Sequence, residues 1–316
     1  MWILAVFAVA GGLAQFIDGT LGMGFGVTSA TVLLAMGVAP VTASAATHAA
    51  KLPTTLISGL SHWRAGNIDG RILARVAIPG ALGGFLGAVV LTNISLASAK
   101  GWMSGLLVFF GAVILARFGF GAKLIPTPRN GHTARWLAPI GVVGGFVDAT
   151  GGGGWGPVVT PSLMTVTKHE PRKVVGTTNA AEFVVAVSVS SGFLTGAAQH
   201  GIPWLPVLGL VIGGVIMAPI AARLAGRLPH RPMGTLVGGL VIVVNGVTII
   251  AALGGIPLWL DWTLFAVAVA VPAVVAWRAW QAEKADNART AAQAAAQPGQ
   301  PEQPGRAEVE AGSTAR

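Results

Sequence analysis

The segment Asp18-Gly19-Thr20-Leu21-Gly22-Met23-Gly24-Phe25-Gly26 returns 130 residues later as Asp148-Ala149-Thr150-Gly151-Gly152-Gly153-Gly154-Trp155-Gly156. Aspartate, threonine, alternate glycines and one aromatic residue coincide in the two copies. Further matches follow in the same order: Pro40 with Pro171, Thr47–Lys51 with Thr178–Glu182, Gly83-Gly84 with Gly213-Gly214, and Met103 with Met233. Collinear self-similarity of this kind indicates an internal duplication, and paired glycine interruptions of apolar segments are typical of transporters built from repeats.

The sequence around these segments is too apolar for a water-soluble domain. Of its 316 residues, 53% are hydrophobic and 10% are charged, whereas soluble domains carry about 25% charged residues. Residues 1–50 contain one charged side chain, Asp18, and residues 76–99 contain none. Uncharged apolar stretches of roughly 20 residues are long enough to span a bilayer. We therefore predict a polytopic all-α membrane protein that has the lipid bilayer as its solvent.

The apolar pattern predicts the same set of helices in each half of the chain. The first half has helices over 2–17, 27–37, 42–62, 72–93 and 101–117, and the second half over 136–148, 157–166, 173–196, 203–223 and 232–254, followed by one extra helix over 259–280. This gives repeat 1 over 1–118, a cytoplasmic linker over 119–135, repeat 2 over 136–255, an extra transmembrane helix over 256–282 and a cytoplasmic tail over 283–316. The tail is rich in Ala, Gln, Pro and Glu and is predicted to be disordered.

The net charge of +9 has a topological meaning and does not indicate nucleic-acid binding, because the basic residues lie in short loops between apolar stretches. Four clusters are present: Arg64, Arg71 and Arg75; Arg117, Lys123, Arg129 and Arg135; Lys168, Arg172 and Lys173; and Arg223, Arg227 and Arg231. Such loops mark the cytoplasmic side, which places the N-terminus outside and the linker and tail inside. The basic loops of one half then correspond to uncharged loops of the other half, so the repeats are predicted to be inverted.

The two glycine-rich breaks are the predicted substrate-binding region. Non-helical backbone at membrane depth is tolerated where it lines a cavity or is buried in protein, and free N–H groups at the start of the following helix attract anions. The candidate binding residues in the breaks are Thr20, Gly22, Gly24 and Gly26 in repeat 1 and Thr150, Gly152, Gly154 and Gly156 in repeat 2. The competing interpretation is that these glycines only let helices pack closely, as we expect of Gly80, Gly83, Gly84 and Gly87.

Ionisable residues inside predicted spans are the second set of candidates. Asp18 and Asp148 open the breaks and either carry coupling protons or cap the next helix. Lys51 and Glu182 occupy equivalent positions in the two repeats, so either they form an ion pair or Lys51 attracts an anion while Glu182 takes a proton. The remaining candidates are His48 and Asn179, which lie one turn earlier and point the same way, so that they could hydrogen-bond the same ligand.

Several classes of function find no support in the sequence. There is no nucleophile motif, phosphate-binding loop or zinc-protease motif, so we predict neither an enzyme nor an ATP-driven pump. The absence of cysteine excludes disulfides and thiolate metal sites, and no cofactor or metal site is predicted. The sequence leaves open whether the chain forms a homo-oligomer.

The same motifs give the chain a resemblance to a known family. The duplicated breaks, the run Gly176-Thr177-Thr178-Asn179-Ala180-Ala181-Glu182-Phe183 and the segment His62-Trp63-Arg64-Ala65-Gly66-Asn67-Ile68-Asp69 resemble the TauE/SafE family of sulfite and organosulfonate exporters. The resemblance covers nearly the whole chain except the tail. It implies a permease of the cell inner membrane that moves sulfite, an organosulfonate or a small carboxylate by alternating access, with the site between the repeats.

Two alternatives from other classes remain. A cation or metal-ion carrier would use Asp18, Asp148 and Glu182 as oxygen ligands, and the buried Lys51 argues against it. A membrane scaffold without transport activity would have the tail as its functional part, and the duplicated breaks argue against that.

Overall fold

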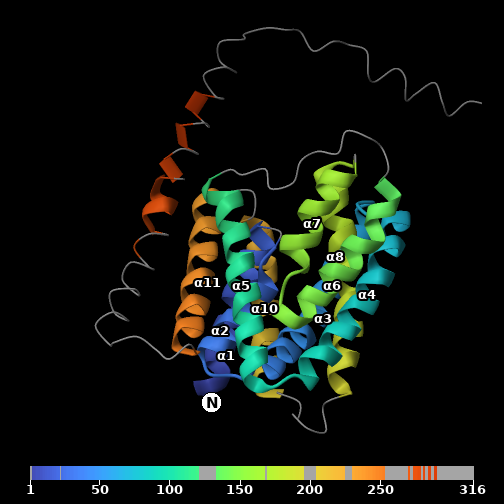
Figure 1. Cartoon of the computed structure of the whole chain (residues 1–316). Helices are drawn as coiled ribbons and strands as arrows, with labels where there is room; N and C mark the ends of the chain where they lie inside the picture. Colours follow the sequence, from blue (N-terminus) through green and yellow to red (C-terminus); the bar gives the residue numbers. More distant parts are fainter. Residues whose placement is uncertain are drawn as a thin grey trace, which may run out of the picture.

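Helices account for nearly all of the described backbone in the computed structural model shown in Figure 1. The structure describes residues 2–21, 23–120, 133–167, 169–195, 204–224 and 230–252, and scattered residues between 270 and 289. Within these ranges every regular element is helical and no strand is present. The fold class predicted from the sequence, an all-α polytopic protein, is therefore confirmed.

The helices of the two halves correspond one to one. The first half contains α1 (Trp2–Leu21), α2 (Phe25–Ala35), α3 (Pro40–Arg64), α4 (Gly70–Asn93) and α5 (Leu96–Gly119). The second half contains α6 (Thr133–Gly151), α7 (Trp155–Val166), α8 (Pro171–Leu194), α10 (Trp204–Leu224) and α11 (His230–Ala252). Every helix predicted in the two halves is present, with bounds shifted by at most five residues. Most of the predicted linker, extra helix and tail lie outside the described residues.

Local sequence sets several helix ends. Pro40 and Pro171 stand in the first turns of α3 and α8, where a missing N–H costs nothing. The Asp69 carboxylate accepts hydrogen bonds from the backbone N–H groups of Arg71 and Ile72 and so caps α4. Ser95 caps α5 in the same way. The prolines and caps fix where the long helices begin, and therefore where the side chains of α3 and α8 lie in the bundle.

The packing follows the duplication. Helix α1 lies along α10, and α4 lies along α6, which are equivalent pairs when the halves are exchanged. Helix α5 packs against α11 and α3 against α8, so each of these elements contacts its own counterpart. In Figure 1 the N-terminus lies at the bottom of the bundle, whereas α7 extends to the top. These relations agree with a two-fold exchange of the halves, and the inverted orientation of the repeats stays a prediction.

Glycines allow the closest of these helix contacts. A Cβ atom on Gly83 would clash with the backbone of Val142, and one on Gly87 would lie 2.7 Å from the carbonyl oxygen of Phe146. Gly80 and Gly84 similarly face Trp155 and Val189 at distances that leave no room for a side chain. The prediction that these four glycines serve packing is confirmed, because small residues let helix backbones approach in membranes.

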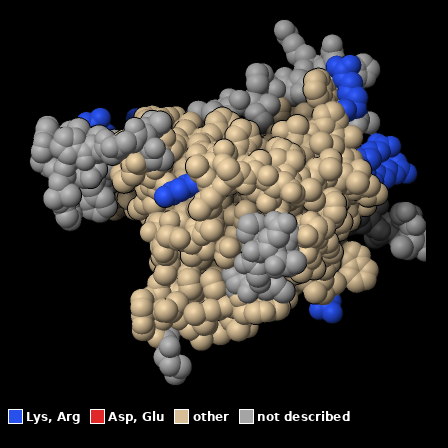
Figure 2. All heavy atoms as spheres, turned by 60° about the horizontal axis from the view of Figure 1, so that its bottom comes forward, with Lys and Arg blue, Asp and Glu red and all other residues tan. Residues whose placement is uncertain are grey.

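Two apolar cores flank the centre of the molecule. One is formed mainly by α1, α2, α5, α10 and α11, and the other mainly by α4, α6, α7 and α8, with α3 contributing to both. Among the described helices, α4, α5, α8, α10 and α11 contain stretches that are long and apolar enough to cross a membrane. Their outer faces expose large apolar side chains such as Leu82, Trp102 and Ile216. Figure 2 shows no Asp or Glu on the visible described surface and only a few separate Lys and Arg side chains among uncharged residues.

Candidate functional site

The two glycine-rich breaks meet at the centre of the bundle. Gly24 and Gly152 have φ values of 127° and 71°, which side-chain-bearing residues rarely adopt. A Cβ atom on Gly26 would lie 2.6 Å from the Cα atom of Gly153 and 3.0 Å from Nζ of Lys51. The backbones of the two breaks therefore touch each other beside the lysine, and a side chain at the crossing would force them apart.

Both aspartates that open the breaks cap the helix that follows. Oδ1 of Asp148 accepts hydrogen bonds from the N–H groups of Gly154 at 2.7 Å and Trp155 at 3.0 Å. Oδ1 of Asp18 accepts one from the N–H group of Phe25 at 3.2 Å. Capping, one of the two roles considered for these residues, is thus a contact that both of them make. The proton-carrying role stays a hypothesis.

Lys51 lies between two carboxylates contributed by the second half of the chain. Its ammonium Nζ is 3.0 Å from Oδ1 of Asp148 on α6 and 2.9 Å from Oε1 of Glu182 on α8. The pairing of Lys51 with Glu182, which the sequence left open, is therefore made in this structure. Lys51 is the single buried Lys or Arg among the described residues, and a buried ammonium is tolerated only when it is paired and hydrogen-bonded in this way.

His48 completes the cluster through its contact with Asp148. Its Nε2 is 3.0 Å from Oδ2 of Asp148, and its Nδ1 is 2.9 Å from the carbonyl oxygen of Ser44. The hydroxyl of Ser44 donates to the carbonyl oxygen of Ala149 at 2.6 Å, so this turn of α3 is fixed to the end of α6. His48 has no exposed surface, and it does not line the cavity described next.

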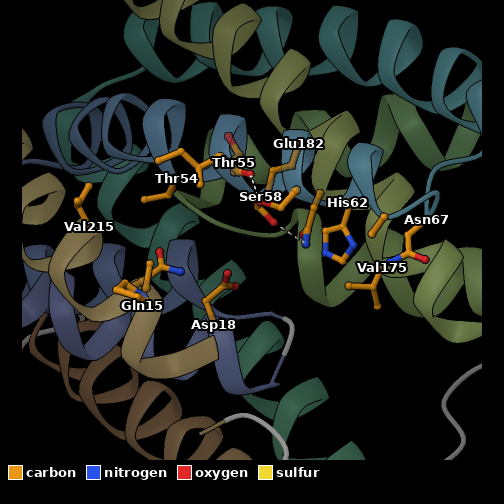
Figure 3. A pocket seen from close by; sticks show the side chains of 16 residues that line it. Gln15, Asp18, Thr54, Thr55, Ser58, His62, Asn67, Val175, Glu182 and Val215 are labelled. Atoms are coloured by element: carbon orange, nitrogen blue, oxygen red, sulfur yellow. Dashed lines mark hydrogen bonds between the residues drawn. The ribbon is translucent and has the colours of Figure 1, made fainter. Parts of the chain in front are cut away.

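A cavity of about 650 Å³ leads from this cluster to one face of the protein (Figure 3). Asp18 and Glu182 line its inner part, together with polar groups from Gln15, Thr54 and Ser58. Asn179 also lines it and donates a hydrogen bond to the Ser58 hydroxyl at 3.2 Å. The far end is lined by His62 in the last turn of α3 and by Ala65 and Asn67 in the turn that follows it. The cavity thus connects the acidic side chains near the breaks with the protein surface beside Arg64.

Glu182 lies between the cavity and the buried Lys51. The Glu182 side chain is 16% exposed, whereas Lys51 is 3% and Asp148 0% exposed. Lys51, His48 and Asp148 do not line the cavity. Glu182 is therefore the member of the cluster that a solute or a proton in the cavity reaches first.

The remaining predicted residues have different surroundings. Thr150 donates a hydrogen bond to the carbonyl oxygen of Phe146 and lines a second, mostly apolar cavity beside Trp102. Gly24, Gly26, Gly152 and Gly154 are buried and Gly156 is partly buried in the breaks. The side chain of Thr20 and the whole of Gly22 lie outside the described residues.

Sequence reasoning missed three kinds of residue at the site. Gly153 stands at the crossing but lies outside the alternating glycine pattern, and the run of four glycines at 151–154 was the signal for it. Ser44, one turn before His48, and the cavity residues Gln15 and Ser58 are ordinary polar residues that no motif distinguishes. Among the described residues no group of three or more His, Asp or Glu side chains could hold a metal ion, and the Lys51 ammonium occupies the space between two of the carboxylates.

Comparisons with known proteins show similarity to membrane transporters. The model of the family described as "Sulfite exporter TauE/SafE" matches residues 7–248. The chain is 46% identical over 250 residues to "Probable membrane transporter protein YtnM" of Bacillus subtilis (strain 168), an alignment that covers 78% of this chain and 83% of that protein. It is 26% identical over 231 residues to "Probable membrane transporter protein YdhB" of the same organism, covering 72% and 91%. No solved structure matches the chain.

Proposed function

Because the chain belongs to the sulfite exporter TauE/SafE family and is a multi-pass membrane transporter, we propose that it moves a small anion by alternating access. The substrate class is sulfite, an organosulfonate or a small carboxylate. The protein is a secondary transporter of the inner membrane, and its coupling ion is the proton.

The observation that supports an anionic substrate best is the position of Lys51. It is the single buried cation among the described Lys and Arg residues, and it lies next to the crossing of the two breaks. The cavity ends at Glu182, whose carboxylate holds the Lys51 ammonium at 2.9 Å. An anion that enters the cavity competes with this carboxylate for the same ammonium. Protonation of Glu182 weakens the ion pair and leaves Lys51 available to the anion.

Asp18 and Asn179 extend the site into the cavity. The Asn179 amide, on α8 one turn before Glu182, supplies hydrogen-bond donors to an oxyanion. Asp18 faces the same space and carries no basic partner among the ion pairs of the described residues, so a proton on its carboxyl group would reduce repulsion of the anion. Proton entry and anion entry therefore use the same cavity and favour each other.

Alternating access requires a boundary along which parts of the molecule move. The cavity lies between α1 and α10 on one side and α3 and α8 on the other, close to the boundary between the two apolar cores. Pro53 interrupts α3 two residues after Lys51, and a proline inside a helix removes a backbone hydrogen bond and weakens the helix there. We expect a movement of one core against the other to close this cavity and open the site to the opposite face.

The distribution of basic residues indicates which side of the membrane the cavity opens to. The cavity opens beside the turn that follows Arg64 and precedes Arg71 and Arg75. Basic loops mark the cytoplasmic side, so the cavity faces the cytoplasm, the N-terminus lies outside and the C-terminal tail lies in the cytoplasm.

A cation carrier is the alternative with an observation in its favour, because Asp18 and Glu182 both face the cavity. The Lys51 ammonium, however, already forms ion pairs with Glu182 and Asp148, and a bound divalent cation would have to displace it.

Flux in proteoliposomes tests the proposal and separates the alternatives. Purified protein is reconstituted with a transmembrane proton gradient, and uptake of radiolabelled sulfite, methanesulfonate, acetate and Mn²⁺ is measured. We expect uptake of at least one of the anions, dependent on the proton gradient, and no uptake of Mn²⁺ above empty vesicles. Uptake of Mn²⁺ alone would establish the cation carrier, and transport of none of the four would contradict the proposed function.

A further inference from the structure

The hydrogen bonds of His48 determine how many protons its ring carries. Nδ1 faces the carbonyl oxygen of Ser44 at 2.9 Å, and Nε2 faces Oδ2 of Asp148 at 3.0 Å. A neutral imidazole has one N–H donor and one acceptor nitrogen. A carbonyl oxygen and a carboxylate oxygen both accept, so a neutral ring would bring an unprotonated nitrogen against an acceptor at one end or the other.

No neighbouring donor removes this conflict. The Ser44 hydroxyl is 3.4 Å from Nδ1, but its single proton is used in the 2.6 Å bond to the carbonyl oxygen of Ala149. The proton between His48 and Asp148 therefore belongs either to Nε2 or to Oδ2. The carboxylate form of Asp148 is favoured because its Oδ1 accepts from Lys51, Gly154 and Trp155 at 2.7–3.0 Å. The proton then resides on the imidazole.

We infer that His48 is an imidazolium in this site, which makes the buried cluster electrically neutral and sets the proton requirement for anion binding. The cluster then contains two cations, His48 and Lys51, and two anions, Asp148 and Glu182, within hydrogen-bonding contact of one another. Neutrality explains how four ionisable groups share an interior with almost no exposed surface, since an unbalanced buried charge costs several kcal/mol.

The charge balance also predicts how many protons move with each anion. This step rests on the proposed function. With Glu182 ionised, the cluster has no net charge to offer an anion in the cavity. One proton on Glu182, the most exposed member, gives the cluster a charge of +1. That state matches one monovalent anion, such as hydrogen sulfite, a monosulfonate or a monocarboxylate. A divalent oxyanion would require a second proton, for which Asp18 is the other carboxyl group in the cavity.

His48 acts here as a positioning residue and a fixed charge, because it is fully buried and does not line the cavity. The groups that contact it come from three helices: Ser44 on α3, Asp148 on α6, and the ring of Phe193 on α8 at 6.3 Å between centroids. Lys51 on α3 shares the Asp148 carboxylate with it. Phe193 contributes no titratable group. Proton exchange with the cavity therefore proceeds through Glu182, and the imidazolium proton stays in place during transport.

Nitrogen NMR of the reconstituted protein tests the imidazolium independently of any substrate. The chain is labelled with ¹⁵N-histidine in lipid bilayers at about pH 8, where an ordinary exposed histidine is neutral. The His48 signals are assigned in a variant whose other five histidines are replaced by glutamine, a count that follows from six histidines in the chain. We expect both His48 ring nitrogens to carry protons and to resonate close together. A pair of widely separated signals, as in a neutral ring, would overturn the inference.

The Asp148→Asn variant is the matched control, because its amide can keep a hydrogen bond to the ring while the negative charge is lost. His48 should become neutral in this variant. If the ring stays doubly protonated without the carboxylate, the stated cause of its charge is wrong. Both measurements are made without substrate, so their outcome does not depend on whether the transported anion has been identified.

Measurement of net current tests the predicted ratio of one proton to one anion. Under a methanesulfonate gradient on solid-supported membranes, one anion moving with one proton produces radiotracer flux without net current. His48→Gln removes one positive charge and should lower the apparent affinity for methanesulfonate on the order of tenfold or more. The His48→Gln, Asp148→Asn double variant removes one charge of each sign and should recover most of that affinity. Flux accompanied by a net current, or a double variant as weak as His48→Gln, would overturn the predicted charge balance, whereas absence of any anion flux would instead contradict the proposed function.

Discussion

The ammonium of Lys51 lies 2.9 Å from the carboxylate of Glu182, and these two residues occupy equivalent positions in the two halves of the chain. They come from α3 and α8, which are themselves equivalent and pack against each other. A duplication followed by divergence of this position to opposite charges therefore produces an ion pair at the contact between the halves. Glu182 of this pair lines the cavity, where we propose that an anion competes for Lys51.

Charge-removing substitutions at this pair distinguish a substrate-binding lysine from a purely structural one. Lys51→Met keeps the side-chain length but leaves Asp148 and Glu182 without their shared cation, which should cost about 3–5 kcal/mol of stability. Glu182→Gln should retain anion binding and lose its pH dependence, because it mimics the protonated acid. The double variant should fold better than Lys51→Met and still fail to bind the anion. Thermal unfolding and methanesulfonate binding measure the two effects, and normal affinity in a stable double variant would show that Lys51 serves structure alone.

Because the two breaks touch each other, one added methyl group at their contact should strongly impair folding or transport. Gly153→Ala should greatly reduce folded protein or abolish transport, because its Cβ would overlap the backbone of Gly26. Gly105→Ala is the matched control, since a Cβ on that helical glycine in α5 meets no atom within 4 Å. The control should be neutral or stabilise by up to about 1 kcal/mol. Yield of monodisperse protein and proteoliposome flux are the measurements, and wild-type behaviour of Gly153→Ala would contradict the close contact.

Much of the fold followed from the sequence because bilayer spans require long uncharged stretches, which composition reveals directly. The duplicated break and the isolated charges within apolar stretches also identified Asp18, Asp148, Lys51 and Glu182 as candidates. Their pairing could not be predicted, because it depends on how α3 is rotated against α6 and α8. Asp148 contacts Lys51 and His48, whereas its sequence equivalent Asp18 faces the cavity. The two positions look alike in the sequence and differ because His48 and Lys51 correspond to Asn179 and Glu182.

The cap of α4 gives a pH-dependent contribution to stability outside the membrane-spanning segments. The N–H groups of Ile72 and Arg71 donate to the Asp69 carboxylate, which lowers its pKa below the ordinary value, and the charges of His169 and Lys173 lower it further. Because the pKa of Asp69 is lower in the folded state, its ionised carboxylate stabilises the fold at pH values above the ordinary, unfolded-state pKa of about 3.9. This stabilisation is lost as the pH falls through the lower, folded-state value.

Substitution of the cap should follow the same dependence. Asp69→Ala removes the acceptor and should destabilise the protein by about 0.5–2 kcal/mol near neutral pH. Asp69→Asn retains an oxygen acceptor and should cost less. The difference between wild type and Asp69→Asn should shrink as the pH is lowered towards the pKa of the carboxylate. Thermal unfolding in detergent across this pH range gives the result, and a pH-independent difference would show that the charge of Asp69 has no role in the cap.

Single cysteines in this cysteine-free chain test the orientation of the helices. Ala65 and His169 lie in turns at helix ends predicted to be cytoplasmic, and Ala97 lies near the start of α5, at the end predicted to be outside; all three are exposed. An impermeant thiol reagent added to intact cells should label Ala97→Cys and leave Ala65→Cys and His169→Cys unlabelled until the membrane is opened. Equal labelling of all three from outside would contradict the inverted arrangement of the repeats.

The cavity itself can be tested with a cysteine at Ser58, which lines it and contacts Asn179 between α3 and α8. If the cavity is the cytoplasmic route to Lys51, Ser58→Cys should react with an impermeant maleimide in inside-out vesicles and remain unreactive in intact cells. Methanesulfonate should slow the reaction, because an anion held near Lys51 and Asn179 occupies the same space; sulfite is unsuitable for this purpose, since it is itself a nucleophile that consumes maleimide. Ala65→Cys, at the outer end of the cavity, is the control whose rate should change less.

The protection should also disappear in Lys51→Met if that variant folds. Protection that persists without Lys51 would mean that the anion binds elsewhere in the cavity, and equal protection of Ala65→Cys would point to a change of conformation in place of direct occupancy.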